Sequence, residues 1–245
     1  MDNNYLVTKA NLLINSRYDL SVNEQRLILM LASLVQPTDE DFKEYDIRVE
    51  DFIKLLDLEG KNSYTALPKI TKELMSKVLE IKTNEFILQM NWLSSCKYMI
   101  GTGRVIMKFS PDLKPYLLQL KEYFTTYKLE NILKMRSKYS IRLYEILKSH
   151  AFKKRCTLTI DELRFMLKAE SYTINYNFRT RILDPAIAEI NQYTDLFVTD
   201  NPIKEGKKYT KIEFTIESSA AMEAKLYRSY DQQADDSDLK YYEKK

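Results

Sequence analysis

The chain has 245 residues, 44% of them hydrophobic, with only 4 glycines and 6 prolines; this favours one large or two ordinary packed domains over a sandwich, barrel or collagen-like chain. No apolar run approaches the ~18 residues of a membrane span and the start lacks a signal-peptide pattern, so we expect no membrane partner. Cys96 and Cys156 lie far apart in the sequence, which makes a disulfide framework unlikely and fits a reducing cytoplasm. The net charge is only +3, but seven acids fall in 39–51 and eight bases in 134–155, which leaves a polyanion partner and an ordinary solvated surface as alternatives.

In chain order, the first half reads as helix, short strand, helix, helix and hairpin. The run Arg26–Ser33 has helical periodicity, and "YDIRVEDFIKLLDL" (45–58) reads as a short strand leading into an amphipathic helix. A third helix is predicted over Tyr64–Val78. A hairpin then joins Phe86–Met99 to Arg104–Phe109 across Gly101.

The second half repeats this order, which indicates an internal duplication. Arg142–Ser149 aligns with Arg26–Ser33, and "CTLTIDELRFMLKA" (156–169) aligns with 45–58. A third helix is predicted near 175–192, and a second hairpin joins Leu196–Thr199 to Tyr209–Ile216 across "KEGKK".

Three helices followed by a hairpin wing make a winged helix, a helix-turn-helix variant that places its third helix in the DNA major groove. We therefore predict an α+β, helix-rich fold of two tandem winged-helix domains. The first domain is predicted over 1–124, the second over 125–219, and a flexible C-terminal tail over 220–245. Winged helices also serve as protein-docking modules, but basic third helices and basic wings favour DNA.

The single histidine, His150, limits the chemistry available. A metal site of several imidazoles, or a relaxase-type nuclease with paired histidine ligands, cannot be built from it. A catalytic triad would need His150 itself, but His150 ends an apolar-periodic helix beside basic residues, and a helix C-terminal cation at that position needs no catalytic explanation. No GxxxxGK[ST] loop occurs, and the "GTG" at Gly101–Gly103 is typical of a hairpin turn. We expect no enzyme activity, no metal and no cofactor.

The stretch "NFRTRILDPAIAEIN" (177–191) allows two interpretations. Asp184 could cap a helix that begins at Pro185, with the arginines in a preceding loop. Alternatively, one longer helix continues through the proline with a kink or a loosened turn. At about 3.6 residues per turn, the apolar stripe from Phe178 to Ile190 is continuous across the proline, which favours the longer helix.

On the longer-helix interpretation, Asn177, Thr180 and Arg181 share an exposed face near the N-terminal end, where a recognition helix contacts base edges. Arg181 could pair with guanine and Asn177 with adenine. Arg179 lies at the azimuth of the apolar stripe, so a phosphate contact or a salt bridge suits it better. The predicted DNA-binding residues of this helix are Tyr176, Asn177, Arg179, Thr180, Arg181 and Asp184, and those of the wing, placed for phosphates, are Lys204, Lys207 and Lys208.

The third helix of the first unit, "LPKITKELMSKVLEI", has lysines but no arginine or asparagine. This composition indicates contact with the DNA backbone more than base reading, so the second unit should dominate specificity. For any single surface lysine, solubility alone is the competing explanation. The predicted DNA-binding residues of this domain are Lys69, Lys72, Ser76 and Lys77.

Three blocks of the chain resemble the iteron-binding plasmid replication initiator family. They are "NLLINSRYDLSVNEQRL" (11–27), "YKLENILKMRSKYSIRLYEILK" (127–148), and "RILDPAIAEIN" followed by Tyr193-Thr194-Asp195. The resemblance spans roughly residues 5–217, and the middle block is the most specific.

The resemblance implies more than the residues themselves show. It implies a double-stranded DNA-binding protein that binds direct repeats (iterons) at a plasmid origin as a monomer, promotes origin opening, and recruits host replication initiator and helicase proteins. It also implies a homodimer, formed through the first domain in equilibrium with the monomer, that represses its own gene. In that family the N-terminal part of the second domain's third helix contacts bases, here Asn177 to Arg181. Thr180 stands where the family would lead us to expect another basic residue. The resemblance therefore does not identify the DNA sequence of the repeat.

Two other functions are considered. A transcriptional regulator could use the same two modules only to occupy an operator. A nicking enzyme for rolling-circle replication is disfavoured by the lone His150. An initiator of the resembled kind would act without chemistry of its own, because binding energy distorts and melts the DNA.

Overall fold

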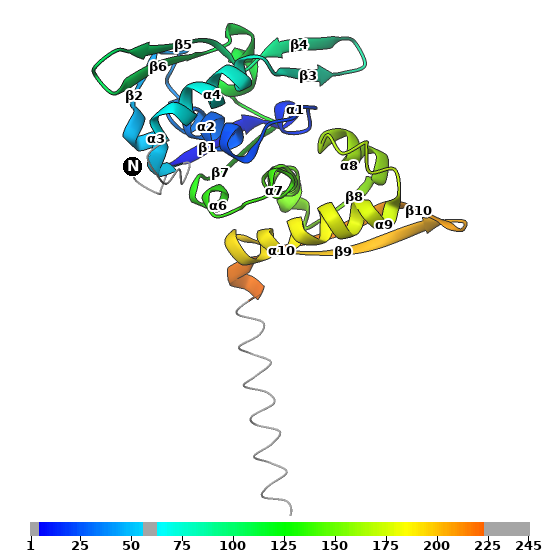
Figure 1. The fold of residues 1–245 in the computed structure, drawn as a ribbon. Helices are drawn as coiled ribbons and strands as arrows, with labels where there is room; N and C mark the ends of the chain where they lie inside the picture. Colours follow the sequence, from blue (N-terminus) through cyan, green and yellow to red (C-terminus); the bar gives the residue numbers. More distant parts are fainter. Residues whose placement is uncertain (1–4, 56–62, 223–245) are drawn as a thin grey trace, which may run out of the picture.

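The computed structural model describes residues 5–55 and 63–222 of the chain. Two units lie one above the other, the first in the upper half of Figure 1 and the second in the lower half. The predicted tail, 220–245, lies outside the described residues from 223 onward. Positions 1–4 and 56–62 of the predicted first domain also lie outside them.

The first unit contains the three helices and the wing of a winged helix, with additional flanking elements. Its sheet has the antiparallel order β2-β6-β5, and the β5–β6 hairpin is the wing. In chain order the elements are β1 (Leu6–Ala10), α1 (Asn11–Ile14), α2 (Val22–Ser33), β2 (Tyr45–Arg48), α3 (Val49–Leu55), α4 (Ser63–Met75), β3 (Val78–Lys82), β4 (Ile87–Asn91), β5 (Leu93–Met99), β6 (Arg104–Phe109), η1 (Pro111–Leu113) and α5 (Lys114–Leu117).

The second unit repeats this plan. Its sheet has the order β8-β10-β9, with the β9–β10 hairpin as the wing. Its elements, and those leading into it, are β7 (Phe124–Lys128), α6 (Glu130–Leu133), α7 (Lys138–His150), η2 (Ala151–Lys153), β8 (Arg155–Thr159), α8 (Ile160–Met166), α9 (Asn175–Phe178), η3 (Arg179–Leu183), α10 (Asp184–Tyr193), β9 (Leu196–Glu205) and β10 (Lys208–Ser218). The predicted internal repeat and the two winged-helix units are confirmed.

Capping boxes start a helix in each unit. Ser21 accepts a hydrogen bond from the Glu24 amide, and the Glu24 carboxylate accepts one from the Ser21 amide, which begins α2. Thr159, the last residue of β8, makes the same reciprocal pair with Glu162 and begins α8. Each box satisfies amide groups that the first turn of a helix leaves without a partner, so the chain turns from strand or loop into helix at a defined residue.

A hairpin that the sequence analysis did not predict follows the third helix of the first unit. The helix α4 ends at Met75, not at Val78, and β3 then pairs with β4. The side-chain amide of Asn91 donates to the Met75 carbonyl at 3.0 Å and so satisfies a helix-terminal acceptor. The region Phe86–Met99, predicted as one strand, is therefore divided between β4 and β5.

The wing of the second unit is longer than predicted. Strand β9 extends to Glu205 and β10 begins at Lys208, so most of the predicted "KEGKK" loop is strand. The turn is tight because Gly206 adopts a φ of 63°, a left-handed conformation that favours glycine. Lys204 and Lys208 therefore lie on the strands, and Lys207 lies in the turn between them.

A two-stranded ribbon connects the start of the chain to the segment between the units. Strand β1 pairs antiparallel with β7, with Leu6 opposite Lys128 and Ala10 opposite Phe124. The predicted boundary between 124 and 125 falls inside β7. The ribbon therefore holds the N-terminal strand against the chain that enters the second unit.

The core helices α2 and α7 pack against each other, and two arginines cross between them in a reciprocal way. Arg142 of α7 donates to the carbonyls of Ile14, the last residue of α1, and Ser16, at 2.7 and 2.9 Å. Arg26 of α2 donates to the carbonyls of Leu133, the last residue of α6, and Met135, at 2.6 and 3.0 Å. Arg26 and Arg142 are equivalent positions of the internal repeat, so the interface has approximate two-fold symmetry.

A buried ion cluster completes this interface. The Lys9 ammonium lies 2.8 Å from the Glu145 carboxylate, and Arg142 lies 3.1 Å from the same group, with all three side chains almost inaccessible to solvent. The hydroxyls of Tyr18 and Tyr127 donate to Glu145 at 3.2 and 2.5 Å. Burial raises the pKa of Glu145, but the charges of Lys9 and Arg142 outweigh burial and leave this pKa below its ordinary value.

The basic stretch 134–155 is thus partly internal. Arg142 is buried, Lys138 pairs with Asp19 at 2.5 Å, and Lys148 pairs with Asp195 at 2.5 Å. Neither of the two alternatives, a polyanion surface or a solvated surface, describes these three residues. Their charges are engaged by partners within the protein.

The buried cluster predicts a large stability loss for Glu145→Gln. Removing one partner of a buried ion pair leaves the other charges uncompensated, which typically costs about 3–5 kcal/mol. Glu130→Gln is the matched control, because the exposed Lys128–Glu130 pair should contribute less than about 1 kcal/mol. Urea denaturation of both variants measures the difference, and equal losses would contradict the importance of the cluster.

Candidate nucleic-acid interface

The third helix of the second unit runs without a break from Asn175 to Tyr193, through α9, η3 and α10. Asp184 has helical angles, φ −59° and ψ −47°, whereas a capping residue would be extended. Pro185 lacks an N–H, and its ring collides with the carbonyl four residues earlier in a regular α-helix. The helix relieves this by widening into a π-helical segment, Arg179–Leu183. The longer-helix interpretation is correct, and Asp184 is not a cap.

The helix buries one side and leaves another open. Its buried side chains are those of the predicted stripe: Phe178, Ile182, Leu183, Ala186 and Ile190. Asn177 is half-buried, while Thr180 and Arg181 are exposed. Within the described part of the chain, the side chains of Asn177 and Arg181 have no hydrogen-bond or ionic partner, so both are available to a ligand.

Arg179 connects the helix to the wing. Its guanidinium lies 2.8 Å from a carboxylate oxygen of Asp200 on β9 and 3.2 Å from that of Asp184 one helical turn away. The hydrogen bond to Asp200 raises the pKa of Arg179 above its ordinary value. The salt bridge that the sequence analysis allowed for Arg179 is present. Its partner Asp200 was not predicted, and only the helix-to-wing packing reveals it.

The N-terminal end of the helix is held by two further polar residues that the sequence analysis missed. The side-chain amide of Asn175 donates to the Tyr209 carbonyl on β10 at 3.0 Å. Arg164 of α8 donates to the Asn175 side chain at 2.8 Å and to the Thr173 carbonyl at 3.0 Å. Because α8, the recognition helix and the wing share these bonds, the end of the helix is fixed relative to both neighbours.

The wing presents lysines at its tip. Lys204, Lys207 and Lys208 are all exposed, and the Lys204 ammonium lies 4.8 Å from the centre of the Tyr209 ring. The neighbouring acid Glu205 is paired with Lys211 at 2.6 Å, so it does not neutralise these three. The predicted phosphate-binding residues are therefore gathered on one ribbon beside the recognition helix.

The candidate residues of the first unit are less uniform. Lys69 and Lys72 lie exposed on α4, and Lys69 is only 4.0 Å from Glu73. Ser76 and Lys77 lie beyond the end of α4, and the Lys77 ammonium is 2.6 Å from the nearly inaccessible carboxylate of Glu24. The structure therefore groups Lys69 and Lys72 on one helix and places Lys77 in a contact with α2.

The two third helices lie on the outer sides of the central helix pair. In Figure 1, α4 lies above α2 and α10 lies below α7, and the wings β5–β6 and β9–β10 extend to opposite sides.

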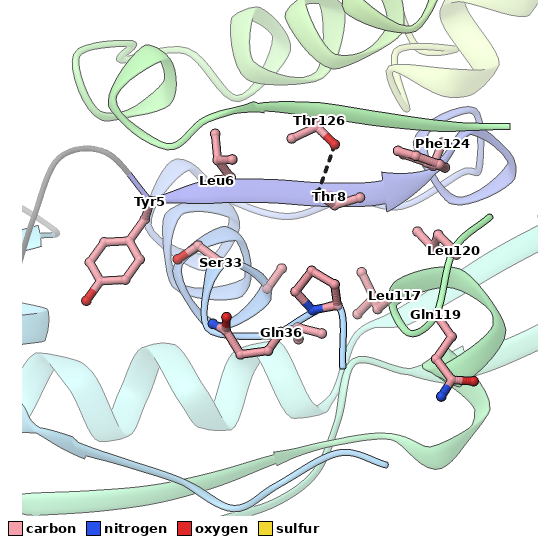
Figure 2. A pocket seen from close by; sticks show the side chains of 13 residues that line it. Tyr5, Leu6, Thr8, Ser33, Gln36, Leu117, Gln119, Leu120, Phe124 and Thr126 are labelled. Atoms are coloured by element: carbon pink, nitrogen blue, oxygen red, sulfur yellow. Dashed lines mark hydrogen bonds between the residues drawn. The ribbon is translucent and has the colours of Figure 1, made fainter. Parts of the chain in front are cut away.

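A cavity of about 670 Å³ in the first unit lies away from these helices. It is formed by the outer face of the β1–β7 ribbon, the end of α2, and the segment after α5, and the hydroxyls of Thr8 and Thr126 meet at its edge at 3.0 Å (Figure 2). None of the 13 described residues that line it is charged, so it does not suit a phosphate.

Other candidate sites are few in the described ranges. Residues 5–55 and 63–222 contain no cluster of three or more metal-ligating side chains and no helix long and apolar enough to cross a membrane. His150 ends α7, where burial lowers its pKa. Cys96 and Cys156 are free thiols.

Two helix-turn-helix units with wings, arranged about a central helix pair, define the class of tandem winged-helix proteins. A family model described as "Initiator Replication protein, WH1" matches residues 6–148, and one described as "Initiator Rep protein, WH2" matches residues 159–216. The chain belongs to this family of replication initiator proteins.

Individual relatives agree with this assignment. A replication initiation protein of Escherichia coli is 31% identical over 235 residues, which cover 89% of this chain and 71% of the relative. The PI protein of Escherichia coli is 27% identical over 207 residues, covering 69% and 68%. The solved structure of Pi initiator protein in complex with iteron DNA has a TM-score of 0.74 at 24% identity, covering 89% of this chain and 99% of that one, and shares its fold.

The contact between Arg179 and Asp200 predicts that Arg179→Gln loosens the wing. Loss of a charged hydrogen bond costs about 1.5–3 kcal/mol, and the strands β9 and β10 should open more readily. Hydrogen exchange of the β9–β10 amides measures this opening. Lys211→Gln, which breaks the exposed pair with Glu205 on the same ribbon, is the control and should leave exchange nearly unchanged. Equal exchange in both variants would show that Arg179 does not position the wing.

Proposed function

We propose that this replication initiator binds double-stranded DNA at direct repeats of a plasmid origin and promotes opening of the duplex. The observation that carries this proposal is the recognition helix, which combines a polar flank, Asn177 and Arg181, whose side chains have no partner among residues 5–55 and 63–222, with a lysine-bearing wing fixed at its side. The similar Pi initiator protein is bound to iteron DNA in its own structure, which supports the choice of ligand.

The second unit supplies sequence recognition in this proposal. Its helix enters the major groove, where Arg181 donates to guanine O6 and N7 and Asn177 pairs with adenine N6 and N7. Lys204, Lys207 and Lys208 contact phosphates, which give affinity without sequence preference. Arg179 acts indirectly, because its guanidinium is already engaged by Asp184 and Asp200.

The first unit supplies a second, weaker contact. Lys69 and Lys72 of α4 are exposed and face the backbone of the adjacent groove, one helical turn away. We further propose that the first unit forms a homodimer in equilibrium with the monomer, and that the dimer represses the protein's own gene. Host initiator and helicase proteins would then join the monomer at the opened origin.

The mechanism proposed here uses binding energy alone. The free-energy cost of distorting the duplex is offset by the extra protein–DNA contacts that the distortion permits. This protein makes and breaks no covalent bond in DNA. It needs no cofactor, and its place is the bacterial cytoplasm, on the plasmid.

The proposal is tested by footprinting the protein on the DNA that flanks its gene and by deleting the gene from the plasmid. We expect protection of an array of direct repeats and loss of replication, restored by supplying the protein from another replicon. A transcriptional regulator without an initiator role would protect only an operator, and the deleted plasmid would still replicate.

Arg181→Ala should weaken binding to the protected repeat by about 1–3 kcal/mol while changing binding to random DNA little, because a bidentate contact to guanine discriminates between bases. Lys207→Ala combined with Lys208→Ala is the contrasting variant. It should weaken both kinds of DNA alike and reduce the salt dependence by a slope of about 1–2. Fluorescence anisotropy over a salt series measures both, and equal losses for Arg181→Ala on the two DNAs would show a phosphate contact only.

A further inference from the structure

An apolar cavity of about 310 Å³ lies between the recognition helix and the wing. Its floor is formed by core side chains, among them Ile160, Phe178 and Ile212. Its rim carries Tyr176 from the first turn of the helix and Tyr209 from β10. The volume is at the lower end of the ~300–1,000 Å³ range of small-ligand sites, which suits one aromatic ring system better than a peptide.

The two tyrosines are unusually open for aromatic residues beside a core. Tyr176 is 73% exposed and Tyr209 is 43% exposed. Tyr209 precedes a β-bulge, because it pairs with Lys204 while Lys211 pairs with Ile203, which leaves Thr210 outside the register of the two strands. Bulges re-aim neighbouring side chains near binding sites. The hydrogen bond from Asn175 to the Tyr209 carbonyl then fixes this part of the wing against the helix.

The charges around the cavity are arranged for a nucleotide. Arg179 lines the cavity and forms ion pairs with Asp184 and Asp200, which neutralises both acids. The ammonium of Lys204 on β9 lies over the Tyr209 ring at the rim, and the exposed Lys208 directly precedes Tyr209 on β10. The cavity is lined mainly by apolar side chains, and the guanidinium of Arg179, which also lines it, is already engaged by Asp184 and Asp200, so the site fits a nucleobase inside and its phosphates beside the lysines better than a phosphate alone.

We infer that this cavity captures one base that leaves the stack when the second unit is bound to duplex DNA. The base would lie against the rings of Tyr176 and Tyr209, as extruded bases do in pockets lined by aromatic and apolar side chains. Stacking on the protein replaces part of the stacking lost in the duplex. The inference rests on the proposed function and gives the opening of the duplex a specific site on the protein.

The test uses the full-length protein and a duplex containing one protected repeat, with 2-aminopurine scanned through both strands. This base brightens when its stack opens or a stacked neighbour leaves, so wild-type protein should produce a bright position at one step within the footprint. Tyr176→Ala and Tyr209→Ala should abolish the bright position and weaken binding of a single-stranded oligonucleotide of the same sequence about tenfold each. Tyr176→Phe and Tyr209→Phe retain the ring and should retain both signals.

Tyr123→Ala is the matched control, since Tyr123 is 78% exposed in the first unit and does not line the cavity. It should behave as wild type. A footprint without any bright position in wild-type protein would overturn the capture of a base while leaving repeat binding intact. A bright position that survives both alanine variants would also overturn it. Equal loss of the footprint in the alanine and phenylalanine variants would show hydroxyl contacts to phosphate instead. Absence of any footprint would refute repeat binding itself.

Discussion

The arrangement of the two winged helices depends on the reciprocal arginine contact between their core helices. Arg26 and Arg142 each cross to the other unit and donate to two carbonyls there, one on the last residue of a short helix and one two residues further on. A helix end leaves such carbonyls without partners, and a planar guanidinium can satisfy two of them at once. The contact is specific in direction, so it fixes the rotation of one unit against the other as well as their separation.

The ion cluster of Lys9, Arg142 and Glu145 adds a second constraint at the same interface. Two cations and one carboxylate are buried together, and burial lowers the pKa of Lys9 despite the attraction of Glu145. Such a cluster contributes little net stability compared with an apolar core, but it strongly disfavours any arrangement that separates its members. The relative position of the third helices of the two units follows from it, because α4 packs on α2 and α10 packs on α7.

Much of this fold could be predicted from local patterns. The repeat of helix, strand and helix is carried by capping residues such as Ser21 and Thr159 and by apolar periodicity, which are local in sequence. The continuous stripe across Pro185 also identified the long helix correctly. What the sequence could not show are pairings between distant residues. In the sequence, Arg142 is one more basic residue of the stretch 134–155. Only the structure shows that it is buried and that it contacts Glu145 and the Ile14 carbonyl.

The two arginines of the recognition helix also differ in their pairing with distant residues, which the sequence alone does not show. Arg179 and Arg181 are two residues apart and chemically identical, yet Arg179 is engaged by two carboxylates and Arg181 by none of the described residues. The π-helical segment that accommodates Pro185 contains both arginines. Its geometry directs the guanidinium of Arg179 toward Asp200 and leaves the guanidinium of Arg181 on the open flank of the helix. An arginine already paired within the protein would have to give up those bonds to bind a base, whereas an unpaired one loses only water. The proline therefore affects recognition through the helix geometry that it imposes, although it contacts no ligand itself.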